Sequence, residues 1–279
     1  MAKDNSISCP DYSFNPRHAL VGSQMFFVAF GALVMVPLLT GLNPSVAMFT
    51  AGVGTLAFQL ITKGRVPIFL ASSFAFIAPI QYGIQAWGLP ATLCGLAMSG
   101  LFYVLLSYLV GRFGVRIIER FLPAIVTGPV IMVIGFSLAP VGVNMALGMA
   151  GGEQVVPREV SLSIAGLSLL ATIIASVWGK GIIKLIPIFC GIVTGYVASI
   201  IYDFSTGQQL LVNLQPVRDA AWLSLPQFVL PAWSLEAVLF ILPIAVAPAI
   251  EHIGNVYAIS SVTGRDYTKN PGLNRTLLG

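Results

Sequence analysis

The chain has 279 residues, of which 57% are hydrophobic and only 9% are charged. A soluble domain carries about 25% charged residues, so the composition excludes a soluble globular protein. Apolar runs of about 20 residues are too long for barrel strands and predict an all-α polytopic membrane protein. The net charge of +4 gives no reason to expect a nucleic-acid partner, because basic residues in such a chain mark cytoplasmic loops.

Eight spans are predicted in chain order, after a polar N-terminal tail at 1–17 that is retained as part of the mature chain. If the N-terminus is cytoplasmic, every basic residue except Arg158 and Arg218 falls on the cytoplasmic side. This distribution supports both the number of spans and their orientation. The predicted spans cover 18–40, 44–62, 67–87, 90–111, 123–147, 160–178, 185–202 and 234–260.

The third predicted span is irregular. It contains Pro67, Pro79 and Gly83, together with the adjacent hydroxyls of Ser72 and Ser73. Proline removes a backbone hydrogen bond, and irregular backbone at membrane depth is tolerated only where it is buried or lines a cavity. A proline-interrupted span therefore points to a transport site. An ordinary kinked helix is the alternative interpretation.

The eighth predicted span carries Glu251 next to His252 within an otherwise apolar run. A carboxyl at the centre of a span costs about 2.5–3.5 kcal/mol on insertion, so it predicts a substrate or proton site. The alternative is a carboxyl held in a hydrogen bond between helices. His252 points about 100° away from Glu251 on a helix, so packing and function remain equally open for it.

Small residues recur at four-residue spacing in three spans, and this pattern predicts close helix packing. Among chemical motifs, the sequence offers no phosphate-binding glycine loop, no metal-ligand cluster and no nucleophile–base pair. We therefore expect no enzyme activity, no cofactor and no metal site. The small-residue sets are Ala47, Ala51 and Thr55; Ala91, Gly95 and Ser99; and Gly191, Gly195 and Ser199.

Four segments together resemble a known family. They are FGALVMVPLL (30–39), LASSFAFIAPI (70–80), AIEHIGN (249–255) and NPGLNR (270–275). They are similar to the bacterial uracil permeases of the nucleobase–ascorbate, or uracil–xanthine permease, family of proton-coupled symporters. The resemblance runs along essentially the whole chain.

The resemblance implies a fold of fourteen spans in two inverted repeats of seven, with the third span part strand and part helix. On this basis the chain is a truncated form that ends before the ninth span. The implied divisions are the cytoplasmic tail 1–17, core spans one to four at 18–122, gate spans five to seven at 123–203, an extracytoplasmic linker at 204–233, core span eight at 234–260 and a cytoplasmic segment at 261–279.

The resemblance also assigns roles in substrate binding. Ala32 lines the base, Phe74 offers its backbone N–H to a base carbonyl with Ser72 beside it, and Glu251 receives an N–H of the base. The family has a histidine four residues after the glutamate, whereas this chain has Asn255, which cannot titrate. Glu251 is the main candidate for proton coupling, followed by His252 and Asn255.

The expected function is that of a nucleobase transporter of the bacterial inner membrane, working by uracil:proton symport and alternating access. The expected partners are a nucleobase, a proton and the lipid bilayer, and the small-residue faces allow a homodimer. Two alternatives stay open. One is a truncated, non-transporting membrane fragment, and the other is an anion carrier or channel of the same fold, although an acidic site residue argues against anions.

Overall fold

A computed structural model describes residues 29–114, 124–150, 153–207, 211–219 and 226–279. Within these ranges the regular secondary structure is helical apart from one short antiparallel pair, β1 (Met149–Ala150) and β2 (Glu153–Gln154). Five described helices are long and apolar enough to cross a membrane: Pro44–Ile61, Leu89–Phe113, Arg158–Val177, Pro187–Thr206 and Leu235–Thr263. The predicted all-α polytopic membrane fold is therefore confirmed, while the count of eight spans stays a prediction.

The chain divides into two compact units. Of the described residues, unit 1 contains 32–114, 124–134 and 226–279, and unit 2 contains 29–31, 135–150, 153–207 and 211–219. The predicted assignment of such stretches to a core and a gate remains a prediction. The predicted tail 1–17 and most of the first span lie outside the described residues.

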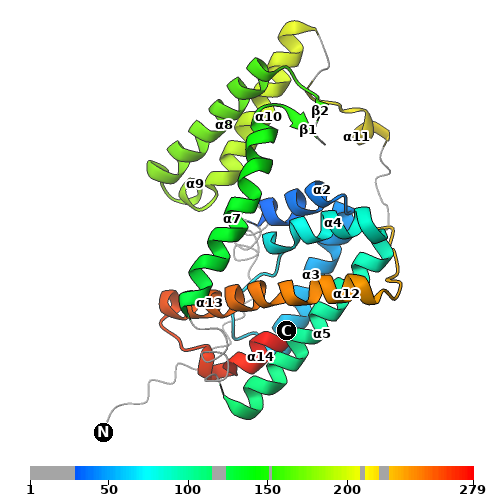
Figure 1. Cartoon of the computed structure of the whole chain (residues 1–279). Helices are drawn as coiled ribbons and strands as arrows, with labels where there is room; N and C mark the ends of the chain where they lie inside the picture. The colour runs from blue at the N-terminus through cyan, green and yellow to red at the C-terminus, as the bar shows by residue number, and fades with distance from the viewer. Residues whose placement is uncertain (1–28, 115–123, 151–152, 208–210, 220–225) are drawn as a thin grey trace. The chain divides into compact units, whose positions relative to one another are not determined.

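Unit 1 is built from two groups of helices that are far apart in sequence (Figure 1). Its elements, with η marking π- or 3₁₀-helical turns, are η1 (Gly31–Met35) at its border, α2 (Val36–Thr40), α3 (Pro44–Ile61), η2 (Phe74–Phe76), α4 (Ile77–Trp87), α5 (Leu89–Phe113), α12 (Leu235–Ile241), η3 (Leu242–Ala245), α13 (Val246–Thr263), η4 (Thr268–Gly272) and α14 (Leu273–Leu278).

Unit 2 is dominated by two antiparallel helices, and α7 (Ala124–Ala146) begins in unit 1 and ends in unit 2. The predicted linker at 204–233 is partly helical, because α10 continues to Thr206 and α11 follows it. The other unit 2 helices are α8 (Arg158–Val177), α9 (Ile182–Leu185), α10 (Pro187–Thr206) and α11 (Gln215–Asp219).

Local sequence signals explain where the unit 1 helices begin and end. Asn43 caps α3 by accepting a hydrogen bond from the Ser45 N–H at 2.9 Å, and Pro44 supplies a preset first turn. Helix α5 ends at Gly114, whose φ of 79° is readily adopted only by glycine. The Ser234 hydroxyl caps α12 by accepting from the Ala237 N–H at 3.3 Å.

Small residues bring helices close together in both units, as predicted. In unit 1 a Cβ at Gly95 of α5 would lie 2.8 Å from the Ala237 carbonyl oxygen of α12. In unit 2 the Gly191 carbonyl of α10 accepts a hydrogen bond from the Ser168 hydroxyl of α8 at 2.7 Å. A Cβ at Gly191 would also collide with Thr172 of α8. These glycines therefore allow backbone contact between helices.

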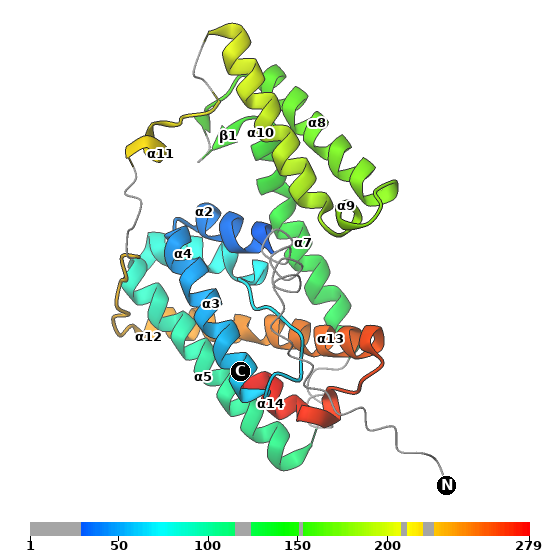
Figure 2. The ribbon, with the colours of Figure 1, turned by 180° about the vertical axis from the view of Figure 1, so that it is seen from behind.

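The third predicted span is not one continuous helix. Residues 67–73 lie outside any helix, and the α-helical part begins only at Ile77 after the turn η2. Figure 2 shows this extended segment running from the end of α3 to the start of α4. The irregular backbone that Pro67 indicated is therefore present, and it ends at the Ser72–Ser73 pair.

Side chains of α3 satisfy the backbone of the extended segment. The Gln59 amide nitrogen donates to the carbonyl oxygens of Val66 and Ile68 at 3.1 and 3.0 Å. The Leu70 N–H donates to the Thr55 hydroxyl at 3.1 Å. Thr55 had been interpreted as part of a packing face; the structure adds a hydrogen-bonding role.

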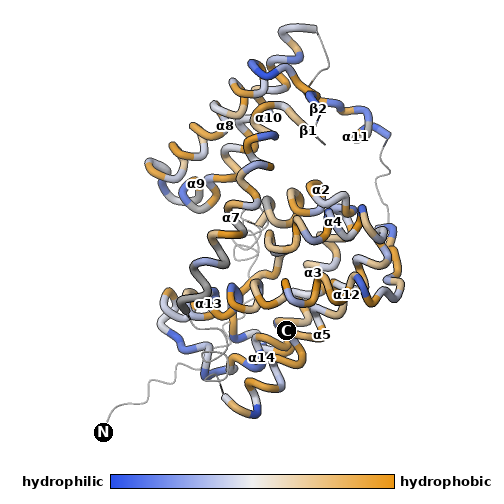
Figure 3. Tube along the Cα trace, in the orientation of Figure 1, coloured by the Kyte–Doolittle hydropathy of each residue, from blue (hydrophilic) through white to orange (hydrophobic). Residues whose placement is uncertain are grey.

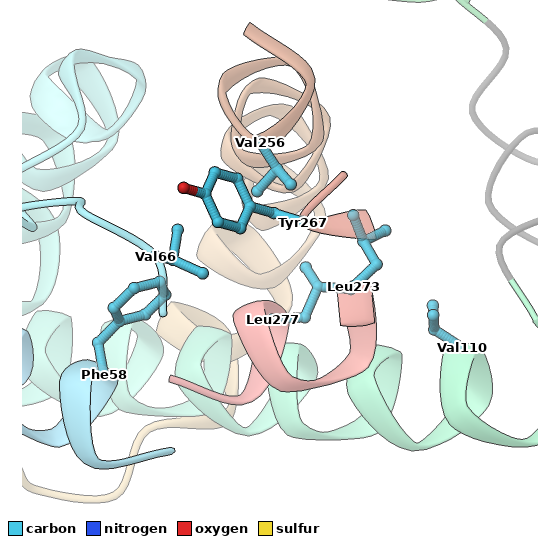
Figure 4. Close-up of a cluster of buried hydrophobic side chains, with 7 residues drawn as sticks. All are labelled: Phe58, Val66, Val110, Val256, Tyr267, Leu273 and Leu277. Atoms are coloured by element: carbon cyan, nitrogen blue, oxygen red, sulfur yellow. The ribbon is translucent and has the colours of Figure 1, made fainter. Parts of the chain in front are cut away.

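One end of unit 1 is closed by a cluster of buried apolar residues (Figure 4). Helix α14 contributes two of them and packs against α5, α3 and α13. The cluster joins the end of α3 to the C-terminal segment, and Ile68 and Leu70 of the extended segment pack against it. Its members are Phe58, Val66, Val110, Val256, Tyr267, Leu273 and Leu277.

The helix surfaces are strongly apolar. Hydrophobic residues cover most of each long helix, and hydrophilic residues gather at helix ends and connections (Figure 3). Large side chains such as Leu60 of α3 and Tyr108 of α5 are mostly exposed. A soluble protein rarely exposes such contiguous apolar surface, whereas in a bilayer the same side chains contact lipid.

Candidate functional site

Ser73 and Glu251 meet within unit 1, although 178 positions separate them in sequence. The Ser73 hydroxyl donates to Glu251 Oε2 at 3.4 Å. Ser73 stands at the end of the extended segment, and Glu251 lies in the middle of the long helix formed by α12, η3 and α13. The structure therefore joins the two sequence features that had been singled out separately.

Ser73 also starts the helix that follows it. Its backbone is extended, and its hydroxyl oxygen accepts a hydrogen bond from the Ala75 N–H at 3.3 Å. The first N–H groups of a helix have no partner within the helix and carry a partial positive charge. The Phe74 N–H is one of these groups, and the Phe74 side chain is 37% exposed.

The site therefore combines a carboxylate acceptor with N–H and O–H donors. Glu251 is exposed within the described part of the chain. Such an arrangement complements a small neutral molecule that carries both an N–H donor and a carbonyl acceptor. It does not suit an anion, since the nearest formal charge is negative.

The other predicted site residues have different surroundings. Ala32 is half-buried in η1. Asn255 is exposed on α13, four residues after Glu251 and therefore on the same helix face. His252 points elsewhere, because its Nε2 lies 3.1 Å from the Thr276 hydroxyl of α14.

The hydrogen bonds of Thr276 define how His252 is held. The Thr276 hydroxyl also lies 3.1 Å from the Leu273 carbonyl, to which it can donate; which group donates between Thr276 and His252 depends on the histidine tautomer. This contact holds His252 against α14, and its role in proton coupling stays a prediction.

A cavity of about 470 Å³ lies between α2, α3, α4 and α5 and is bordered by Gln227–Val229 and Pro231. Ser72 and Ser73 line it, whereas Ala32, Phe74 and Glu251 do not. Its size is within the range of small-molecule pockets. Ser73 therefore stands between this mainly apolar cavity and the Glu251 carboxylate.

Comparison with known proteins identifies the family. A family model described as "Permease family" matches residues 17–279. The chain belongs to this Permease family. Membership agrees with the prediction of a membrane transporter rather than an enzyme. Within the described residues, no group of three or more His, Cys, Asp or Glu side chains could hold a metal ion.

Several members of the Permease family resemble the chain over more than nine-tenths of its length. It is 52% identical to a "Probable uracil permease" of Haemophilus influenzae, over 94% of the chain and 61% of that protein. It is 39% identical to the "Uracil permease" of Bacillus subtilis, over 92% of the chain and 59% of that protein. The chain thus spans about three-fifths of the length of these relatives.

The sequence interpretation did not identify Ser73, Gln59 and Thr55 individually as site residues. Ser73 was recognised only as part of a pair, and the resemblance favoured Ser72. Gln59 is an amide in the last turns of an apolar helix, directly before a proline-interrupted segment. That juxtaposition is the signal that could have revealed it, since an amide in a span needs partners.

Proposed function

We propose that the protein to which this chain belongs is a nucleobase transporter, and that uracil is its substrate. The observation that carries the proposal is the Ser73–Glu251 contact, which places a carboxylate beside the start of the helix at Phe74. Uracil presents ring N–H groups and carbonyl oxygens, which match these acceptors and donors. The names of the relatives support the same substrate.

In the proposed binding mode, Glu251 accepts an N–H of the base and the Phe74 N–H donates to a base carbonyl. Ala32 and Ser72 complete the described side of the site. We propose that a second extended span, from the second inverted repeat of the full-length protein, faces the first and forms the opposite side of the site. Among described residues, the backbone groups of Phe69 and Ala71 have no hydrogen-bond partner, so this edge of the extended segment can accept such a strand.

Transport is proposed to be proton symport by alternating access in the bacterial inner membrane, with the N-terminus in the cytoplasm. Uracil is neutral at pH 7, so its accumulation requires a coupled ion. Glu251 is the proposed proton site, because a protonated carboxyl gains an O–H donor and accepts hydrogen bonds more weakly, which would link protonation to binding. A homodimer is compatible with the small-residue faces.

The test is the binding of radiolabelled uracil to the purified chain in lipid nanodiscs. We expect saturable binding that Glu251→Gln weakens by about tenfold or more, because a hydrogen bond to a charged group contributes about 1.5–3 kcal/mol. Glu236→Gln is the control, since Glu236 lies exposed in the first turn of α12. Equal affinities of the unaltered chain and Glu251→Gln would refute the proposed role of Glu251.

Uptake into cells that lack their own uracil permease then separates the alternatives. Proton-driven uptake supports symport by the chain itself. Binding without uptake supports the alternative of a non-transporting fragment. Selective uptake of an anion in place of uracil would favour the carrier or channel alternative and overturn the proposal.

A further inference from the structure

Helix α3 provides a polar edge along the extended segment. Thr55 and Gln59 are four residues apart and therefore lie on the same face of the helix. Both are half-buried, whereas the apolar side chains of Leu56 and Leu60 on the same helix are 68% and 79% exposed. The polar face of α3 thus points into unit 1 at the extended segment, and the exposed face is apolar.

The three hydrogen bonds from this face engage alternate residues of the segment, which begins with a three-residue turn in which the Ile68 N–H donates to the Val66 carbonyl at 2.9 Å. Gln59 binds the carbonyl groups of Val66 and Ile68, and Thr55 binds the N–H of Leu70. Backbone groups of alternate residues point to the same side of an extended strand. The side chains of α3 therefore take the place of a neighbouring strand along one edge.

The chemistry of the two side chains suits this role. A glutamine amide has two N–H donors, and both are used on the extended segment. The Thr55 hydroxyl donates to the Ala51 carbonyl at 2.7 Å, which leaves its oxygen free to accept from Leu70. Each donor of these hydrogen bonds therefore has an acceptor, and the bonds form in only one register of the extended segment against α3.

That register decides which hydroxyl faces Glu251. Successive residues of an extended chain point to opposite sides, so a slip by one position exchanges the two orientations. Leu70 is the last anchored residue, and Ser73 follows three positions later, a distance of about 10 Å in extended chain. A slip would present Ser72 in place of Ser73 and move the Phe74 N–H.

We infer that Gln59 and Thr55 are positioning residues of the candidate site, because they fix the register of 66–70 and so place Ser73 and the Phe74 N–H beside Glu251. The inference rests on the proposed function insofar as that site binds uracil. The stabilisation of the extended segment by Gln59 and Thr55 can be measured without any substrate.

The experiment compares Gln59→Met and Thr55→Val with the conservative Thr55→Ser. Methionine keeps the length of glutamine without its N–H groups, and valine keeps the shape of threonine without its oxygen. Thr263→Val is the control, because the Thr263 hydroxyl bonds only within α13, to the Ile259 carbonyl at 2.8 Å. All variants are made in the 279-residue chain and placed in nanodiscs.

Hydrogen exchange, followed by mass spectrometry on peptides covering 66–76, gives the first readout. We expect Thr55→Val, which loses one hydrogen bond to the segment, and Gln59→Met, which loses two, each to speed exchange by about tenfold or more. Uracil affinity gives the second readout and should fall by about fivefold to tenfold in the same two variants. Thr55→Ser and Thr263→Val should match the unaltered chain in both readouts.

The outcomes distinguish the inference from the proposed function. Unchanged exchange in Gln59→Met and Thr55→Val would overturn the inference whether or not uracil binds. Faster exchange with unchanged uracil affinity would also overturn the inference, because the hydrogen bonds from α3 would then stabilise the extended segment without positioning the binding site. Failure of the unaltered chain to bind uracil would count against the proposed function. Gln59 and Thr55 would then stabilise the extended segment without positioning a uracil site.

Discussion

Ser73 holds two hydrogen bonds at once, since its hydroxyl donates to Glu251 and accepts from Ala75. We expect Ser73→Ala to destabilise the start of the helix by about 1 kcal/mol, as for other lost caps, and to weaken uracil binding. Ser73→Thr should retain both properties. Ser72→Ala, which removes the neighbouring hydroxyl, should have the smaller effect. Thermal unfolding and uracil binding measure these differences, and a larger effect of Ser72→Ala would contradict the assignment.

Asn255 gives a second prediction for a single residue. It shares a helix face with Glu251 and cannot titrate, so Asn255→His adds an ionisable group one turn away. A histidine changes charge near pH 6.5, and its positive form should stabilise the ionised carboxylate. We expect uracil affinity to become more dependent on pH between about pH 5.5 and 7.5. Asn255→Gln is the control, and identical pH profiles would refute the expectation.

The sequence indicated some of these residues and not others, for a physical reason. Glu251 could be singled out because burying an ionisable group in a membrane span costs free energy, and its role in binding stays a prediction. The choice between Ser72 and Ser73 was not predictable from their types, since adjacent hydroxyls in an extended chain differ only in direction. That direction depends on Gln59 and Thr55, whose partners are visible only in three dimensions.

Between helices, the contact of α5 with α12 is sensitive to a single methyl group. A Cβ at Gly95 would meet the Ala237 carbonyl and the Ile241 side chain at less than 3 Å. We expect Gly95→Ala to destabilise the protein by about 1–3 kcal/mol. Gly100→Ala in the same helix has nothing within 4 Å and should be neutral or stabilising by up to about 1 kcal/mol. Thermal unfolding in one detergent compares the two, and equal midpoints would contradict the packing argument.

The turn after α13 gives a prediction about pH. Asp266 accepts hydrogen bonds from the Thr268 hydroxyl and N–H and pairs with Lys269 Nζ at 3.2 Å. The Thr268 hydroxyl, followed by Lys269, holds the pKa of the Asp266 carboxyl below its usual value. Because the pKa of Asp266 is lower in the folded chain than in the unfolded chain, its ionised form stabilises the fold. This stabilisation is complete above about pH 4 and is lost as the pH falls through the pKa of the folded state.

The effect at Asp266 should be small, because both partners are exposed to solvent. Hydrogen exchange of peptides covering 264–270 should therefore be insensitive to Asp266→Asn below the folded pKa. Near neutral pH the same variant should exchange slightly faster than the unaltered chain. A variant effect that grows with acidity would contradict this sign.

At the level of helices, sequence patterns predicted more than they did for the site. The spacing of Gly95 and Ser99, and of Gly191 and Gly195, correctly indicated close packing, because only small residues permit it. The pattern did not name α12 and α8 as the respective partners. Pro67 indicated irregular backbone but could not show how its hydrogen bonds are satisfied.

For the whole molecule, the distribution of basic residues predicts which connections face the cytoplasm. Alkaline phosphatase, which is active only outside the cytoplasm, can be fused after chosen residues. We expect activity after Gln154 and Asp219 and none after Gly64 and Gly181, following the positive-inside rule. Active fusions after Gly64 would reverse the proposed orientation.

The discontinuity of unit 1 has a consequence for synthesis. Because 178 positions separate Ser73 from Glu251, a ribosome adding about 5–20 residues per second makes the second residue roughly 9–36 s after the first. The helices of unit 2 are delivered to the membrane in this interval. Gln59 and Thr55 are already synthesised at the start of this interval. Helix α3 can therefore hold the extended segment in place before Glu251 is made.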